Sequence, residues 1–362
     1  MKKTSFQIRS SRGKFEIRSY ETGDEEKILS SWETVFGRSM PAAHWQWKYP
    51  LNPAGFRTLL CLSENGEVAV HYAGQGCRVC FFGKEVLGLQ LTDIFTHPAY
   101  RWAIGGKTGL FIKTARIFWQ TFLEKAPFSP EYELKVSASK ALFLWGLPGH
   151  RHARLGQKML SYDTLPRAFY AVKPPTKCKP GRKRLWLIEK AVPGLDPLPS
   201  GLNELWKRFR RKYNPFCLAK DAAYLSWRFW QRPLDCRKPE LTLTNTTSPR
   251  YRFYFLKRPW SLKIRAWLVT TIEKEGILIL DFLAEQPEML TKLLIFLLSE
   301  YGDNSLRVWT SETSPWKRAF LDAGFVEQEE SLGIVPSIQG FEDGFMEKKE
   351  TFHWIMGDAD LF

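Results

Sequence analysis

The most informative part of the chain reads Leu91-Thr92-Asp93-Ile94-Phe95-Thr96-His97-Pro98-Ala99-Tyr100-Arg101-Trp102-Ala103-Ile104-Gly105-Gly106-Lys107-Thr108-Gly109-Leu110-Phe111. The apolar run over 86–95 predicts a strand, and the spacing of apolar residues over 109–122 predicts a helix. The turn between them is rich in glycine, so backbone N–H groups can approach an anion closely. The N-terminus of the following helix adds free donors and partial positive charge. We therefore expect a cradle for a pyrophosphate group at this turn.

The candidate cofactor-binding residues lie along this cradle. Arg101 and Lys107 would supply full positive charges there. The complete candidate set is Ile94, Phe95, Thr96, Arg101, Gly105, Gly106, Lys107, Thr108 and Gly109. Residues 105–108 also look like the end of a P-loop, but Arg101 occupies the position of the first P-loop glycine, which argues against a P-loop ATPase.

The same stretch resembles the GNAT superfamily, the acyl-coenzyme A N-acyltransferases. The segment 97–101 fits the family pattern of a strand followed by x-x-P-x-Y-R, a glycine-rich turn and a long helix. Ile104 stands where the family has its first glycine, and the glycines of this chain follow it. The resemblance implies an α/β fold of the α+β type. It also implies acetyl-CoA or another acyl-CoA as co-substrate, without a metal.

The order of predicted elements repeats in the two halves of the chain. Each half is predicted to contain a strand, a helix, two or three strands, a helix, a strand and a helix. Trp47-Lys48-Tyr49 in the first half matches Trp227-Arg228-Phe229 in the second, and Asp93 corresponds in order to Asp281. We therefore expect two tandem GNAT-like domains, each a mixed, mostly antiparallel sheet flanked by helices.

The two domains are expected to have different roles. Residues 1–170 should bind the acyl-CoA, 171–200 should form a basic linker rich in proline and glycine, and 201–362 should not bind a cofactor. Asp281 and Glu285 stand at the cradle position of the second half, where negative charge repels a phosphate. The second half would instead shape the acceptor site, with Trp309, Trp316, Trp354 and Asp358 as candidate lining residues.

The general acid that the resemblance implies is not at its usual place. The family often has a tyrosine in the helix expected over 150–160, but Gln157 stands at that position. Our catalytic candidates are Asp93, late on its strand, and His150, whose imidazole titrates near neutral pH. Two structural alternatives stay open: His150 as an ordinary surface histidine, and Asp93 as a hydrogen-bonding residue at a strand end.

The net charge of +15 is concentrated in one segment. Residues 173–212 contain twelve Lys and Arg against three Asp and Glu. The segment is either a solvated surface or a site for an anionic partner, such as a polyanion, an acidic carrier or anionic lipid. No zinc-finger, helix-turn-helix or ribonucleoprotein motif occurs, which argues against nucleic acid.

The remaining composition indicates a cytoplasmic protein. The six cysteines form no dense framework, which is typical of reduced thiols, and Cys77-x-x-Cys80 lacks a second ligand pair for zinc. The longest apolar run, Leu293 to Leu298, is far shorter than the ~20 residues that a transmembrane helix needs. We therefore expect no transmembrane segment.

These observations favour an acyl-CoA-dependent N-acyltransferase, specifically an N-acetyltransferase. The acceptor would be an amine of a small polar molecule or an amino sugar. Two alternatives stay open. One is a Fem-like transferase that uses aminoacyl-tRNA and also pairs two such domains. The other is a non-catalytic GNAT-like binding protein.

Overall fold

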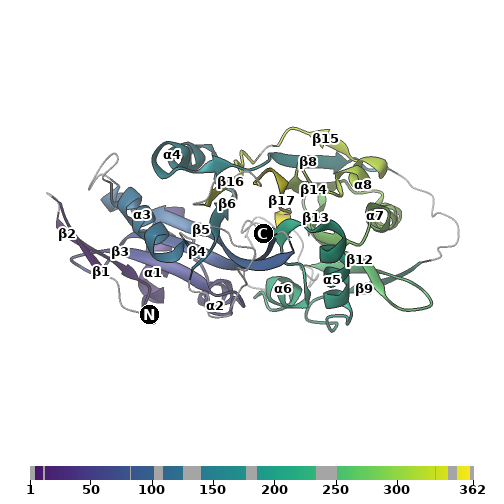
Figure 1. Ribbon diagram of the computed structural model, residues 1–362, viewed down its shortest axis with the longest axis horizontal. Coiled ribbons are helices and arrows are strands. Elements are labelled where there is room, and N and C mark those ends of the chain that lie inside the picture. The colour runs from purple at the N-terminus through teal and green to yellow at the C-terminus, as the bar shows by residue number, and fades with distance from the viewer. Residues whose placement is uncertain are drawn as a thin grey trace. The chain divides into compact units, whose positions relative to one another are not determined.

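The computed structural model describes residues 5–10, 13–81, 83–101, 109–124, 140–176, 186–233, 251–330, 332–340 and 349–358. The chain forms two compact units, and Figure 1 labels most of their helices and strands. Unit 1 comprises Met1–Arg78, Glu85–Thr164 and Val335–Glu347, and unit 2 comprises Val79–Lys84, Leu165–Ile334 and Lys348–Phe362. Each unit contains a sheet with helices packed on it, which confirms the predicted fold class.

Unit 1 is built on a sheet with the strand order β1-β2-β3-β4-β5-β6-β16-β7. Strands β1 to β4 pair antiparallel in sequence, whereas β5 and β6 are parallel. The strands are β1 (Ser5–Ser10), β2 (Gly13–Ser19), β3 (Phe56–Ser63), β4 (Val68–Phe81), β5 (Lys84–Thr96), β6 (Phe143–Gly146), β7 (Asp163–Thr164) and β16 (Ser337–Gly340). The helices are α1 (Glu25–Phe36), α2 (Ala42–Lys48), α3 (Leu110–Phe122) and α4 (His150–Leu160).

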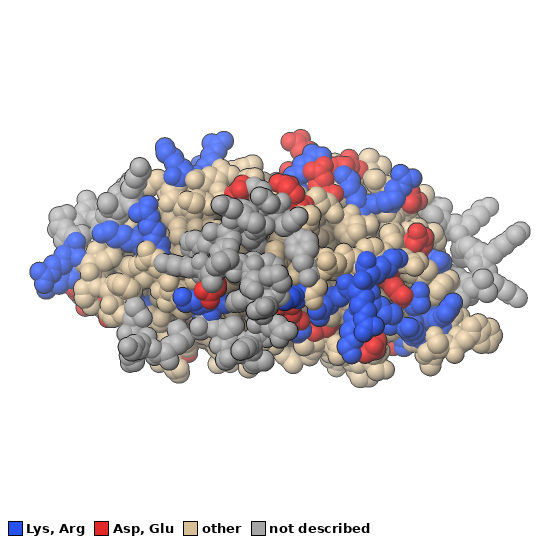
Figure 2. Space-filling view, in the orientation of Figure 1, with Lys and Arg blue, Asp and Glu red and all other residues tan. Residues whose placement is uncertain are grey.

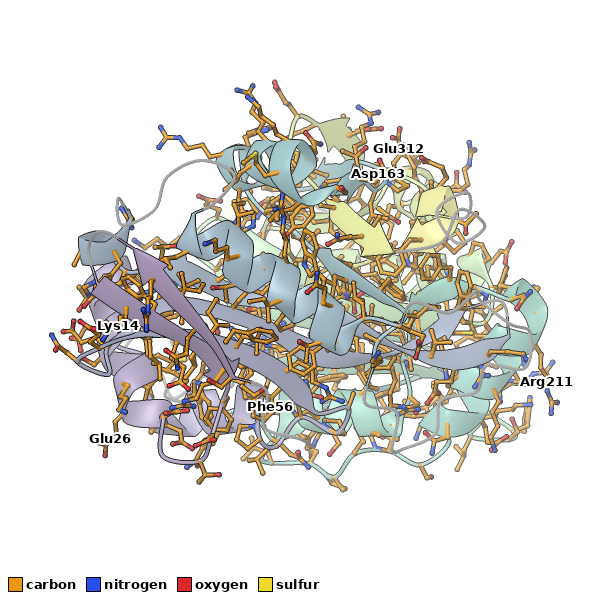
Figure 3. All side chains as sticks on the ribbon, turned by 60° about the vertical axis from the view of Figure 1, so that its left-hand side comes forward. Lys14, Glu26, Phe56, Asp163, Arg211 and Glu312 are labelled. Carbon is orange, nitrogen blue, oxygen red and sulfur yellow. The ribbon has the colours of Figure 1, made fainter. Side chains whose placement is uncertain are left out.

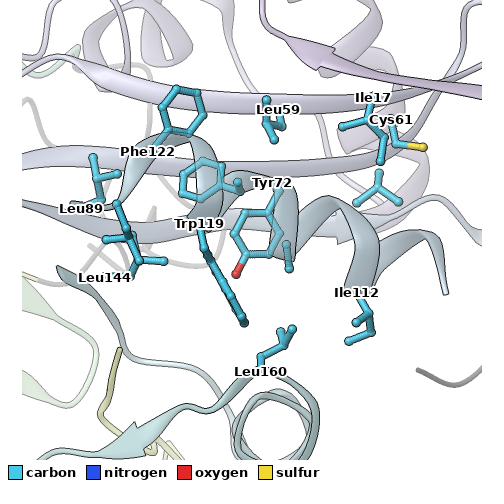
Figure 4. Packing of buried hydrophobic residues seen from close by; sticks show 14 of the residues in the cluster. Ile17, Leu59, Cys61, Tyr72, Leu89, Ile112, Trp119, Phe122, Leu144 and Leu160 are labelled. Atoms are coloured by element: carbon cyan, nitrogen blue, oxygen red, sulfur yellow. The ribbon is translucent and has the colours of Figure 1, made fainter. Parts of the chain in front are cut away.

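The sheet of unit 1 carries an apolar layer on each face. Because side chains alternate along a strand, Leu59 of β3 belongs to one layer and Leu60 to the other. The layer of Leu59 includes Trp119 of α3 and Leu160 of α4, as Figure 4 shows. The layer of Leu60 contains Trp32 of α1 and Trp45 of α2, together with Phe95 of β5.

Unit 2 contains a second sheet with the order β15-β8-β14-β13-β12-β11-β9. Its strands are β8 (Ala168–Lys173), β9 (Leu187–Ala191), β11 (Arg252–Lys257), β12 (Ile264–Glu273), β13 (Gly276–Ala284), β14 (Leu306–Ser311) and β15 (Val326–Gln328). The helices are α5 (Leu202–Tyr213), α6 (Ala222–Leu225), which continues as a π turn over Ser226–Trp230, α7 (Pro287–Tyr301) and α8 (Lys317–Asp322). Short strand β10 (Phe216–Leu218) pairs with β17 (Phe352–His353) and with the last residues of β4.

The two sheets exchange one strand each. Strand β8 follows α4 in the sequence, yet it lies between β14 and β15 in the sheet of unit 2. Strand β16 follows β15, yet it lies between β6 and β7 in unit 1. The sequence analysis placed a single linker at 171–200, between domains ending at 170 and beginning at 201. In the structure the units are discontinuous in sequence, and part of that segment forms β8 and β9.

Most predicted elements occur at their expected places. The helices predicted over 109–122 and 150–160 are α3 and α4, and the same order of elements recurs in both units. The sequence pattern also predicts separate strands over 67–74 and 77–82, but residues 68–81 form one continuous strand, β4. A further strand that the pattern predicts over 241–244 lies outside the described residues.

Candidate functional site

The candidate site lies at the carboxyl end of the only parallel strand pair that unit 1 shows among its described residues. Gly88, Leu89 and Gln90 of β5 register with Phe143, Leu144 and Trp145 of β6. Beyond this register β5 continues to Thr96, and the chain after β6 begins α4 at His150. Ligands of open α/β sheets bind outside the carboxyl ends of parallel strands. The residues after Gln90 and after Trp145 are therefore the candidate site.

Asp93 lies in the part of β5 beyond this register and is held by three neighbours. Its carboxylate Oδ2 accepts a hydrogen bond from the Tyr49 hydroxyl at 2.7 Å and lies 2.5 Å from Nζ of Lys48. Its backbone carbonyl lies 2.7 Å from Nδ1 of His71. Because a carbonyl oxygen only accepts, Nδ1 of His71 carries the proton. We call Lys48, Tyr49, His71 and Asp93 the Asp93 cluster.

The Asp93 cluster is buried and supports an unusual backbone conformation. The side chains of Lys48 and Asp93 are 2% and 5% exposed, so each charge depends on the other for compensation. Asp93 has a φ of 50°, and the left-handed region costs a non-glycine residue ~1–2 kcal/mol. Its contacts with Lys48, Tyr49 and His71 hold the residue there. The cluster thereby fixes the backbone just before Ile94 to Thr96, the last residues of β5.

His71 is neutral in this environment. Burial is the main cause that lowers its pKa, to about 4, and the positive charge of Lys48 acts in the same direction. The ring stacks on Phe95, with ring centres 5.1 Å apart. Strand alternation directs the next residue, Tyr72, to the opposite face of the sheet, where its hydroxyl lies 2.8 Å from that of Tyr162. Burial raises the pKa of Tyr72 to about 12, so this phenol is protonated at neutral pH.

The structure describes five of the nine predicted cofactor-binding residues. Ile94, Phe95 and Thr96 end β5, and the Phe95 side chain is buried against Trp32 and His71. Arg101 is exposed, and its Nε donates to the Thr96 carbonyl at 3.3 Å. Gly109 is the N-cap residue of α3. The other four, Gly105, Gly106, Lys107 and Thr108, lie outside the described residues.

The N-terminus of α3 has the chemistry of an anion site. Within the described part of the chain, no side chain caps this end, and its first turn contains no acidic residue. Helix α7 occupies the same place in the element order of unit 2, but it begins with Pro287-Glu288 and follows Glu285. Negative charge and a missing N–H make the N-terminus of α7 a poor phosphate site. The residues present at α3 therefore fit a pyrophosphate, and those at α7 do not.

His150 and Asp93 lie at the same edge of the sheet. His150 is the first residue of α4 and is exposed; it follows β6 as Asp93 follows the paired part of β5. No hydrogen bond between these two side chains occurs among the described contacts. Gln157, at the position of the implied tyrosine, is exposed on α4. Among the described residues, few side chains at this edge of the unit 1 sheet can therefore transfer a proton.

Unit 2 contains a second cluster at the equivalent strand end, which we call the Asp281 cluster. Strands β13 and β14 are parallel over Ile277–Ile279 and Leu306–Val308, and Asp281 follows the paired part. Oδ2 of Asp281 lies 2.9 Å from Nζ of Lys220 and accepts the Tyr224 hydroxyl at 2.7 Å. Lys220 also forms an ion pair with Asp358. Burial raises the pKa of Asp281 to about 6, against the opposing effect of Lys220.

The segment 354–358 covers the strand end beside the Asp281 cluster. The Ser311 N–H and the Thr310 hydroxyl both donate to the Trp354 carbonyl, at 2.8 and 2.9 Å. Gly357 lies so close that an added Cβ would be 2.7 Å from Cβ of Asp281. Trp309, Trp316, Trp354 and Asp358 are all buried. These four residues, which the sequence analysis placed along the acceptor site, are therefore not open to solvent.

In unit 2 the ion pair with the strand-end aspartate is not formed by the residue that aligns with Lys48. That residue, Arg228, donates through Nε to the Gly357 carbonyl at 2.8 Å. Lys220 forms the ion pair with Asp281, as Lys48 does with Asp93. Lys48, Tyr49 and His71 were not recognised as site residues, and the only signal for the first two was the repeated Trp-x-x motif. No group of three or more His, Cys, Asp or Glu that could hold a metal occurs among the described residues.

Comparison with known proteins identifies the fold. Residues 16–107 match the family model of the acetyltransferase (GNAT) domain. A probable N-acyltransferase from Enterococcus faecalis has a similar structure, with a TM-score of 0.61 and 10% identity over 91% of this chain and 72% of that chain. A GCN5-related N-acetyltransferase from Anabaena variabilis gives a TM-score of 0.61 and 12% identity over 91% and 73% of the two chains.

A third solved structure agrees with these two. The GCN5-related N-acetyltransferase from Kribbella flavida gives a TM-score of 0.57 and 10% identity over 90% of this chain and 70% of that chain. No curated protein matches in sequence. At such identities a shared structure shows the fold alone. The sequence match over 16–107 and the shared fold together confirm the resemblance of this chain to GNAT acetyltransferases.

Proposed function

We propose that the protein is an acyl-CoA-dependent N-acyltransferase, specifically an N-acetyltransferase, that binds the acyl-CoA through residues 94–109 of unit 1. The GNAT fold supports acyl transfer as the general type of reaction, with an acyl-CoA as co-substrate. The observation that carries the proposal is the N-terminus of α3. It has no acidic first-turn residue and no side-chain cap among the described residues, and it follows the glycine-rich turn directly.

The charge and backbone chemistry of this end suit the pyrophosphate of coenzyme A. Unbonded N–H groups at a helix N-terminus bind anions, and the helix dipole favours negative charge there. Arg101 adds a full positive charge from the other side of the turn, and it is exposed. Its hydrogen bond to the Thr96 carbonyl connects it to the end of β5. The Asp93 cluster then serves to hold that strand end in place.

The difference between the N-termini of α3 and α7 supports one acyl-CoA per chain. In unit 2, the segment 354–358 covers the strand end beside Asp281, and the N-terminus of α7 carries Glu288 after Glu285. A pyrophosphate would meet negative charge there rather than free N–H donors. We therefore assign unit 2 no cofactor, as the sequence analysis expected.

In acyl transfer a neutral amine attacks the thioester carbonyl and gives up a proton as the C–N bond forms. The C–S bond breaks, and coenzyme A leaves as a thiolate that takes up a proton. We propose His150 as the group that accepts the proton of the amine, because it is exposed at the same sheet edge as Ile94 to Thr96. For Asp93 we propose a positioning role, since its charge is already compensated by Lys48. The acceptor would be a small polar amine or an amino sugar, and the reaction would take place in the cytoplasm.

The test is a calorimetric titration of the full chain with acetyl-CoA. We expect one molecule per chain, and Arg101→Ala should weaken binding about 10- to 100-fold, the equivalent of losing a charge-assisted hydrogen bond worth ~1.5–3 kcal/mol. Arg9→Ala, which removes another exposed arginine of unit 1, and Glu285→Gln in unit 2 should both leave the affinity unchanged. The proposal would be contradicted by an unaltered affinity of Arg101→Ala, by two equivalent sites, or by no binding at all. In the last case, the remaining candidate functions would be a transferase that uses charged tRNA and a non-catalytic binding protein.

A further inference from the structure

An exposed apolar tip protrudes from unit 2. The turn between β11 and β12 reads Arg258-Pro259-Trp260-Ser261-Leu262-Lys263. Trp260 is 96% exposed, the highest value among the large hydrophobic side chains of the described residues, and Leu262 is 61% exposed. Removal of these two large apolar side chains from water would be strongly favourable. Their exposure therefore indicates a contact surface.

The tip is an ordered turn. The Arg258 N–H donates to the Lys263 carbonyl at 3.1 Å, and the Leu262 N–H donates back to the Arg258 carbonyl at 2.9 Å. Leu262 adopts a φ of 49°, a conformation that a branched apolar residue rarely has. Asn or Gly would fit that backbone with less strain. The turn thus keeps the Leu262 side chain largely exposed at a strained backbone position.

Positive charge surrounds the base of the tip. Arg258 and Lys263 flank it directly and are exposed. Helix α5 lies beside it, because Arg208 of α5 donates to the carbonyl of Ile264, the residue that follows the turn, at 2.6 Å. Figure 2 shows Lys and Arg side chains gathered over the region where Figure 1 labels α5 and β9.

The acidic residues near this base leave an excess of cations. Glu285 is shared by two arginines, Arg208 and Arg265. Glu204 pairs with Lys207, and Glu189 pairs with Lys257. Arg211 and Lys212, at the end of α5, are exposed as well, and Figure 3 shows Arg211 projecting outward from the helix. The local charge is therefore positive.

We propose that the β11–β12 tip and α5 form a docking surface for a bilayer that contains anionic lipid. Tryptophan favours the interface between headgroups and acyl chains, where an apolar ring and a polar N–H are both accommodated. Trp260 and Leu262 at the apex would enter this layer, while Arg258, Lys263 and the cations of α5 would meet the lipid phosphates. Each cation near an anionic surface strengthens binding about fivefold. The proposal does not depend on the acyltransferase function.

A membrane fits these features better than a nucleic acid or an acidic protein. Single-stranded nucleic acid is bound by aromatic rings set along a basic groove, whereas here a leucine shares the apex with the tryptophan and the cations lie at the base. This arrangement places apolar groups deepest and charges behind them, in the order of acyl chains and phosphates. It also requires no helix that spans the bilayer, and none of the described helices is long and apolar enough to do so.

The test is co-sedimentation of the full chain with vesicles of phosphatidylcholine, alone or with 30% phosphatidylglycerol. We expect at least tenfold tighter binding to the anionic vesicles, weakened by 0.5 M salt. Trp260→Ser/Leu262→Asn should reduce this affinity at least tenfold; Asn suits the φ of Leu262, so the turn is preserved. Arg258→Glu/Lys263→Glu should reduce it at least as much.

The matched control lies at the other end of the same strand. Ile272→Ser/Lys274→Glu changes one exposed apolar residue and one exposed cation at the β12–β13 turn and should stay within twofold of the wild type. Equal binding to neutral vesicles, equal loss in the control, or unchanged binding of the tip variants would overturn the proposal. So would an RNA complex or a dimer that forms through Trp260 in the absence of any vesicle binding.

Discussion

His71 should make unit 1 lose stability in mild acid. Its ring is buried and lies near the Lys48 ammonium, and both effects disfavour a second proton. The Nδ1–H hydrogen bond to the Asp93 carbonyl raises the pKa of His71, but burial outweighs it. The folded-state pKa is about 4, whereas an unfolded histidine has a pKa of ~6.5. The unfolded chain therefore binds the proton more readily. This contribution to stability is fully present above pH 6.5 and is lost as the pH falls toward 4.

The size of the effect follows from these two pKa values. At pH 5 an unfolded histidine is almost fully protonated, whereas only about one folded molecule in ten carries the proton on His71. The linkage relation then gives a loss of about 2 kcal/mol between pH 7.5 and pH 5. The matched variant is His71→Gln, because a glutamine amide can still donate to the Asp93 carbonyl but does not titrate.

The stability of unit 1 should be measured by hydrogen exchange of the backbone amides of β4 and β5. A single melting curve is not suitable, because two units need not unfold together. We expect the wild type to lose about 2 kcal/mol more than His71→Gln over this pH range. Other titrating groups, including the buried His353 of unit 2, are common to both proteins and cancel in the difference. The same pH dependence in both proteins would refute the assigned environment of His71.

Two further predictions concern the interior of each unit. Lys220→Met leaves the carboxyl groups of Asp281 and Asp358 buried without their cation, so we expect unit 2 to lose ~3–5 kcal/mol of stability, measured by hydrogen exchange of the backbone amides of β13 and β14. A loss below ~1 kcal/mol would show that the ion pairs do not form. In unit 1, a Cβ added to Gly156 would lie 2.0 Å from Cδ2 of Tyr162, so Gly156→Ala should cost ~1–3 kcal/mol. Gly149→Ala, with no atom within 4 Å of its added Cβ, is the control on the same helix and should differ from the wild type by much less.

The elements that the sequence determined are those with a strong local pattern. The apolar spacing over 150–160 and the glycines that precede it define α4, and the run over 86–95 defines β5. The repeated order of strands and helices was also visible, because each repeat follows its own local periodicity. The residue types at the turn after Thr96 indicated an anion cradle for a similar reason. The small size of glycine and the positive charge of arginine do not depend on the tertiary structure.

The strand exchange was decided by the tertiary structure. Strands β8 and β16 are short, and each finds its partners in a sheet formed mainly by the other half of the sequence. Pairing of a strand depends on the edge that is available to it, which a local pattern cannot specify. A linker was therefore predicted over 171–200, where the folded chain places parts of a sheet.

The candidate site shows the same division. Asp93 could be selected from the sequence because it stands late on a predicted strand. Its partners Lys48 and His71 come from α2 and β4, and only the packing of α2 against the sheet brings the Lys48 ammonium to the carboxylate. In unit 2 Arg228 is the residue that aligns with Lys48, but Lys220 forms the ion pair with Asp281. A buried charge is satisfied by whichever opposite charge the fold delivers within a few ångströms, and that distance is fixed by tertiary packing rather than by sequence spacing.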